Sequence, residues 1–115
     1  MDITRNAPHN ISAEQATLGS IILEKESILN CIEILHPEDF YRNAHQIIYQ
    51  CALSLFEENQ AVDLVTLTEA LKQRKKLDDI GGASYLTTLM SSVPTAANVE
   101  YYAKIVHGCS VRREL

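Results

Sequence analysis

Histidine, cysteine and paired carboxylates are the residue types in this chain that could bind a metal ion or act as acid, base or nucleophile. The histidines and cysteines are His9, His36, His45, His107, Cys31, Cys51 and Cys109. None of them lie at a spacing typical of metal ligands. The pairs Glu38–Asp39 and Glu57–Glu58 occupy adjacent positions, which point in different directions on a helix. His45 could reach Tyr49 one turn along a helix, so we interpret it as a half-buried helical histidine. We expect no catalytic residue and no metal site here.

Phosphate binding would need glycines followed by a lysine and a serine or threonine. The glycines stand at positions 19, 81, 82 and 108, and no lysine follows any of them. We therefore expect no cofactor in this chain. The basic run 72–76 is followed by two aspartates, and a helix dipole favours cations at this end. We interpret the run as a solvated helix end, and the alternatives are a partner-facing patch or a nucleic-acid contact.

Composition indicates one globular domain in a reducing compartment. The chain has 115 residues, of which 46% are hydrophobic and 22% charged, and its formal net charge is −5. This negative charge argues against a nucleic-acid binder, because attraction to phosphates supplies most of the non-specific affinity. Three widely spaced cysteines are typical of buried, reduced thiols. No apolar run has the length of a membrane span or of a signal peptide, so we expect a cytoplasmic protein without a membrane partner.

Apolar residues recur at steps of three and four, which predicts an all-α fold, a compact bundle of about six helices. The expected helices cover about 12–23, 27–35, 44–58, 62–71, 83–90 and 98–115. Ser12, Asn43 and Asn98 are expected N-caps, while the fourth helix has two possible starts, Asp63 and Thr66. The turn at 37–40 should place Phe40 in the core. The residues expected to face inward include Leu23, Leu29 and Val65.

Gly19 lies inside the first expected helix, where no cap requires a glycine. We interpret it as a point where another helix approaches closely. By domain, residues 1–10 are expected to be a flexible N-terminal arm, 11–97 a globular helical head, and 98–115 the start of a longer helix. Gly108 would be an interior glycine of this last helix. No ending signal follows it, so we expect the chain to be cut inside the helix.

Two apolar seams run along the last expected helix. The first seam is Val99, Tyr102, Val106 and Cys109, and the second is Tyr101 and Ile105. One seam is enough to pack a helix on the body of a domain. The second seam is either buried within the same domain, or exposed and available to another helix.

Five segments of the sequence, taken in order, resemble one known family. They are 8–19; 39–41 with His45 and 47–49; 62–67; 81–86; and 94–103. Together they are similar to the N-terminal domain of the bacterial replicative DNA helicases of the DnaB family. The resemblance implies an all-helical head within a collar of such domains above a hexameric ring. It also implies a motor domain further along the chain, which uses ATP and Mg²⁺ and moves 5′ to 3′ on the DNA strand it encircles.

The resemblance further implies partners for this domain. In that family the N-terminal domain is not catalytic; it pairs with a neighbouring copy and receives primase, and DNA is contacted through the motor domain. The last helix would be the truncated first arm of a helical hairpin. We therefore expect a homo-oligomer, a dimer for this chain and a hexamer for its parent, assembled through exposed members of that helix. The candidate partner-binding residues are Asn98, Tyr101, Tyr102, Ile105, Val106 and Arg112. The alternative function is a free-standing helical adaptor domain that binds one partner helix.

Overall fold

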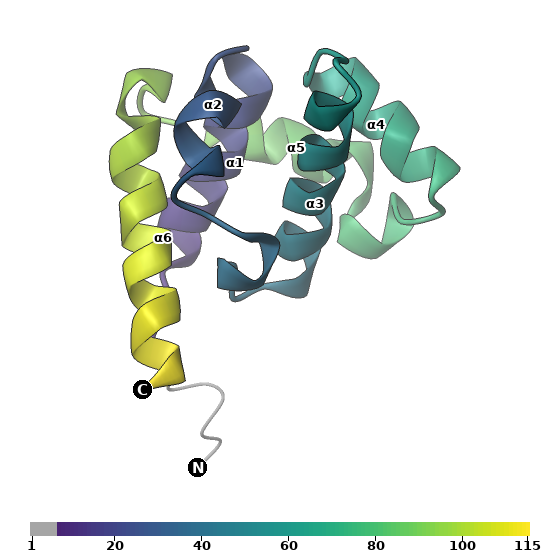
Figure 1. Cartoon of the computed structure of the whole chain (residues 1–115). Helices are drawn as coiled ribbons and strands as arrows, with labels where there is room; N and C mark the ends of the chain where they lie inside the picture. Colours follow the sequence, from purple (N-terminus) through teal and green to yellow (C-terminus); the bar gives the residue numbers. More distant parts are fainter. Residues whose placement is uncertain (1–6) are drawn as a thin grey trace.

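The structure of the protein is a computed structural model that describes residues 7–115. Over this range all of the regular secondary structure is helical, as predicted (Figure 1). The α-helices are α1 (Ile11–Leu23), α2 (Ser27–Ile32), α3 (Asn43–Glu57), α4 (Leu64–Gln73), α5 (Gly82–Ser91) and α6 (Val99–Glu114). Three 3₁₀ turns join them, η2 (Pro37–Asp39), η3 (Asp78–Ile80) and η4 (Ala96–Asn98). No helix in the described part of the chain is long and apolar enough to cross a membrane.

Helix α1 lies at the centre of the bundle, because it is apolar on most of its surface. It packs most extensively on α6 and on α5. Gly19 faces α5, where a Cβ atom would crowd the Leu89 carbonyl and the Val93 side chain. The close approach predicted at Gly19 is therefore confirmed. A larger side chain there would push α1 and α5 apart.

The helix starts differ from the sequence expectation at two places. Helix α1 is capped by Asn10, whose side-chain oxygen accepts from the Ala13 amide at 2.9 Å, so the expected Ser12 cap is wrong. Helix α3 is preceded by Arg42, and Asn43 is already its first residue. In both cases the backbone turns helical earlier than the local motif suggests.

The start of α6 was placed correctly, and α4 begins after the first of its two predicted starts. Asp63 caps α4, and it exchanges two hydrogen bonds of 2.9 Å with Thr66, whose amide and hydroxyl both take part. Asn98 stands at the N-cap position of α6, but its side chain makes no capping hydrogen bond. Gly108 is an interior residue of α6, as predicted.

Three residues expected to face inward are exposed instead. Leu23, Leu29 and Val65 have 44%, 56% and 76% of their surface accessible. Leu23 is the last residue of its helix, whereas Leu29 and Val65 each lie one position from the inward-facing stripe. Helix α2 also ends at Ile32, three residues earlier than predicted. The turn η2 places Phe40 in the core, fully buried as expected.

All three cysteines are free and buried, which confirms the prediction from their spacing. Burial raises the pKa of the Cys31 thiol to about 12 and also raises the pKa of Cys51. Residues 1–6 of the expected N-terminal arm lie outside the described residues. At the arm's other end, the His9 ring stacks on the Tyr41 ring with centroids 4.2 Å apart.

Candidate interaction surface

Helix α6 has one buried face and one exposed face. The buried face, which packs on α1 and α2, consists of Val99, Ala103, Val106, Cys109 and Ser110. Most of the first seam predicted from the sequence therefore lies in the core. Tyr102 is only half-buried, and its hydroxyl donates to the Thr95 carbonyl at 3.3 Å. This bond ties the first turns of α6 to the chain segment that enters it.

The opposite face carries what we call the outer stripe. It consists of Tyr101, Ile105, Gly108, Arg112 and Leu115. The four members within α6 follow one another at steps of four and three, so they share one side of the helix, and Leu115 stands directly after its end. Tyr101 is 66% exposed and Leu115 is 98% exposed, while Ile105 is half-buried. Of the second seam, Tyr101 is thus open to solvent, whereas Ile105 packs partly against the core.

A shallow groove of about 250 Å³ lies beside the first half of the outer stripe. Its walls come from α1, from the segment before α6 and from α6 itself: Asn10, Ser12, Ala13, Ala16, Ser92, Pro94, Tyr101, Tyr102 and Ile105. Aromatic and aliphatic side chains form much of this surface. A groove of this kind can receive an apolar side chain from another helix.

The six residues predicted as partner-binding are placed as follows. Asn98, Tyr101 and Arg112 are exposed, while Tyr102 and Ile105 are half-buried. Val106 is 1% exposed and packs in the core, so its place in a binding surface is a correction to the sequence prediction. The error arises because Val106 belongs to the helix face that α1 covers.

The far end of α6 is fixed to the rest of the domain by Arg113. Its guanidinium donates to the Asp39 carbonyl at 2.7 Å and to the Pro8 carbonyl at 2.9 Å. The same group lies over the Tyr41 ring, 5.5 Å from its centroid. One turn before it, Ser110 donates to the Asp39 carboxylate at 2.8 Å. These contacts set the direction in which the outer stripe points.

A buried polar cluster was missed by the sequence analysis. His45 is fully buried and contacts Glu14 of α1 at 2.7 Å and the Tyr85 hydroxyl of α5 at 2.6 Å. The expected half-buried histidine beside Tyr49 is therefore wrong. Glu14, also buried, was the available signal, because a carboxylate within an apolar helix needs a partner.

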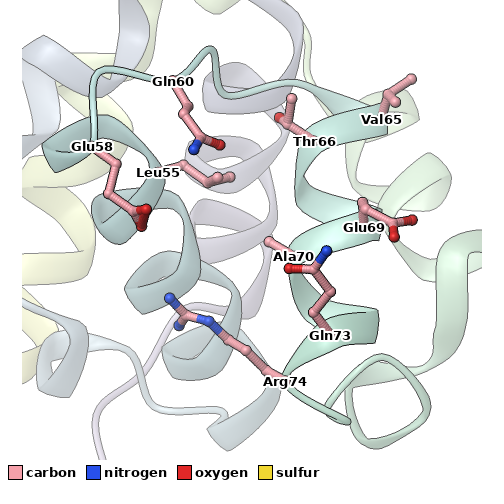
Figure 2. Close-up of a pocket in the computed structure, with 9 residues that line it drawn as sticks. All are labelled: Leu55, Glu58, Gln60, Val65, Thr66, Glu69, Ala70, Gln73 and Arg74. Carbon is pink, nitrogen blue, oxygen red and sulfur yellow. The ribbon is translucent and has the colours of Figure 1, made fainter.

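A groove of about 440 Å³ lies between the end of α3 and the outer side of α4 (Figure 2). It is lined by Leu55, Glu58, Gln60, Val65, Thr66, Glu69, Ala70, Gln73 and Arg74. Figure 2 shows the Arg74 side chain extending from α4 toward the end of α3, on the side where the Glu58 carboxylate points. The lining holds charges of both signs. Within the described residues no group of histidines, cysteines and carboxylates could hold a metal ion.

Comparison with known families gives a match over most of the chain. A family model described as "DnaB-like helicase N terminal domain" matches residues 6–108. The chain is 50% identical over 111 residues to the replicative DNA helicase DnaC of Bacillus subtilis. It is equally similar to the replicative DNA helicase DnaB of Geobacillus stearothermophilus. Each match covers 96% of this chain and 24% of the relative, so the chain spans about a quarter of their length.

Two solved structures resemble the fold. The crystal structure of the N-terminal domain of DnaB helicase from Mycobacterium tuberculosis matches with a TM-score of 0.91 and 46% identity, over 93% of this chain and 78% of that one. A DnaB-like replicative helicase, described together with its interactions with primase, matches with a TM-score of 0.80 and 35% identity. That match covers 91% of this chain and 25% of the helicase.

Proposed function

Since this chain belongs to the DnaB-like helicase N-terminal domain family, we propose that it is the non-catalytic domain of a hexameric replicative DNA helicase. In this proposal it joins neighbouring copies into the collar of the ring and recruits primase during replication. ATP, Mg²⁺ and the translocated DNA strand are handled by a motor domain elsewhere in the parent protein, which works in the cytoplasm.

The observation that carries this proposal is the outer stripe of α6. Tyr101 is the most exposed aromatic residue of the described chain at 66%, and the groove beside it is bounded by Pro94 and Ile105. Exposed apolar residues at steps of four and three are the pattern that one helix offers to another. Arg112 adds a cation within this stripe, which suits a partner helix that carries a carboxylate opposite it.

Recruitment of primase is supported by the similarity to a helicase described with its interactions with primase. Self-association is supported by the apolar character of the outer stripe. A stripe on one helix is small compared with the ~800 Å² per partner that stable interfaces bury. We therefore propose that this chain alone pairs weakly, as a dimer, and that the hexamer forms in the parent protein.

The test compares two variants with a similar loss of exposed apolar surface. Tyr101→Ser removes the largest side chain of the outer stripe, whereas Val65→Ser changes an apolar residue on α4 that is 76% exposed. Sedimentation measures self-association, and fluorescence anisotropy measures binding of the helicase-binding domain of primase. We expect Tyr101→Ser to weaken both by about tenfold or more, as interface aromatic residues commonly do, and Val65→Ser to leave both unchanged.

Other outcomes point to other functions. Equal effects of the two variants would remove the outer stripe from the proposal. If the chain stays monomeric at all concentrations and does not bind the helicase-binding domain of primase, the result would favour the alternative function as a free-standing adaptor. ATP turnover by this chain alone would contradict its non-catalytic role.

A further inference from the structure

The buried cluster of Glu14, His45 and Tyr85 joins three helices and has no part in the proposed partner surface. Glu14 and His45 are only 1% and 0% exposed. One Glu14 oxygen lies 2.7 Å from His45 Nδ1, and the other accepts from the Tyr41 backbone amide at 2.7 Å. Each of these contacts compensates the loss of water around a buried carboxylate. Glu14 is therefore held as an acceptor, and His45 Nδ1 must carry a hydrogen.

On the other side of the imidazole ring lies the Tyr85 hydroxyl oxygen, which has three nitrogen atoms around it. His45 Nε2 lies 2.6 Å from the Tyr85 hydroxyl, whose oxygen also lies 3.2 Å from Arg42 Nη1 and 3.4 Å from Gln15 Nε2. Guanidinium and amide nitrogens can only donate hydrogen bonds. The Tyr85 oxygen is thus the acceptor for both, and the single hydroxyl hydrogen is left to point at His45 Nε2. A hydrogen on Nε2 would place three donors around one oxygen.

The donors around the Tyr85 oxygen thus fix the hydrogen of neutral His45 on Nδ1. We propose that His45 is a proton-operated latch between α3 and α5. In its neutral form, with the hydrogen on Nδ1, it accepts from Tyr85 and leaves the Tyr85 oxygen free to hold Arg42 and Gln15. When His45 takes up a proton, Nε2 becomes a donor to that same oxygen. The hydroxyl hydrogen turns away, and Arg42 is released.

The surrounding charges favour this coupling. The titratable and charged groups that contact His45 or the oxygen it shares are Glu14 from α1, Arg42 at the start of α3 and Tyr85 from α5. The remaining ring contact is apolar, since Phe40 packs edge-on at 6.3 Å between centroids. Glu14 stabilises a protonated ring, while Arg42 repels it across one shared oxygen. Proton uptake therefore works directly against the Arg42 contact.

Nitrogen NMR of the ring tests the assigned state directly. The chain is labelled with ¹⁵N-histidine and examined at pH 7.5. We expect the His45 signals of a neutral ring with hydrogen on Nδ1 and none on Nε2. A ring with hydrogen on Nε2, or one with hydrogen on both nitrogens, would overturn the proposal. Neither result depends on a variant that must fold.

A pH titration tests the latch. In the wild-type chain, the side-chain signals of Tyr85 and Arg42 should change with the same midpoint as His45. Arg42→Gln keeps a donor but removes the charge, so the midpoint of the His45 signals should move to higher pH. Lys72→Gln removes the same charge from an exposed position on α4 and should leave the midpoint unchanged. If the Arg42 signals change with a midpoint different from that of the His45 signals, or if both variants move the His45 midpoint equally, the two side chains are not coupled.

Discussion

The close approach of α1 and α5 at Gly19 gives the sharpest test of the packing. A Cβ atom on Gly19 would lie 2.9 Å from the Leu89 carbonyl carbon and closer still to two further atoms, the Leu89 oxygen and Val93 Cγ2. Real Cβ atoms essentially never come within 3.0 Å of such neighbours. Two of these atoms belong to the backbone of α5 and cannot rotate aside. The Gly19→Ala variant must therefore separate the two helices.

The size of the effect follows from two opposing contributions. Overpacking a core costs about 1–3 kcal/mol, and the rigid neighbours place Gly19 at or above the upper end. Alanine in place of glycine gains about 1 kcal/mol of helix propensity. We expect Gly19→Ala to lower the free energy of unfolding by about 2–3 kcal/mol, a large part of the stability of a domain this size.

Gly108 provides the matched control, since it lies inside α6 and the nearest atom to a new Cβ is Arg112 Nη1 at 3.9 Å. Without a clash, Gly108→Ala should raise the free energy of unfolding by about 0.5–1 kcal/mol. Urea unfolding followed by circular dichroism at low micromolar concentration measures both variants. If Gly19→Ala proves as stable as wild type, or if both variants shift in the same direction, the proposed packing of α1 on α5 is wrong.

Three further predictions concern helix starts and pH. Asn10→Ala should lower the free energy of unfolding by about 1 kcal/mol, because it removes the α1 cap, while Ser12→Ala should stay within about 0.5 kcal/mol of wild type. Urea unfolding of the two variants decides which residue is the cap. Asp63→Ala should lower the free energy of unfolding by about 1 kcal/mol in the same measurement, because it leaves the Thr66 amide without its acceptor. A variant as stable as wild type would contradict the capping box. Burial raises the pKa of the Cys31 thiol from 9.0 to about 12, so between these values the folded chain keeps a proton that the unfolded chain has lost. This contribution to stability is complete below pH 9 and falls as the pH rises toward 12. The urea midpoint should fall more steeply between pH 9 and 11 in wild type than in Cys31→Ala, and parallel curves would refute this.

The sequence was sufficient for features that depend on near neighbours along the chain. Apolar periodicity located the six α-helices of residues 7–115, and Asp63 was one of the two starts proposed for α4. The interior glycine at position 19 correctly indicated a close helix contact, although Gly108 shows that an interior glycine does not always mark one. The family resemblance, which rests on five ordered segments, is also confirmed.

Features that depend on distant residues were harder to predict. His45 meets Glu14 and Tyr85, which are 31 and 40 positions away, so no local spacing could reveal the cluster. Periodicity also could not separate Val65 from its inward-facing neighbours, because a shift of one residue turns a side chain by about 100° around the helix. The same limit applies to Val106, which local patterns could not distinguish from the exposed residues of α6.

The packing of α1 against α6 has a consequence for synthesis on the ribosome. The first helix of the described chain finds its most extensive partner in the last one, and roughly 90 residues separate their ends. At ordinary rates of translation, about 5 to 20 seconds pass between the synthesis of α1 and the synthesis of α6, and the surface of α1 that α6 buries is exposed until then. During this interval the nascent chain is a substrate for chaperones and is prone to aggregate. A message truncated before the codon for Val99 would make that exposure permanent, and its product should be insoluble.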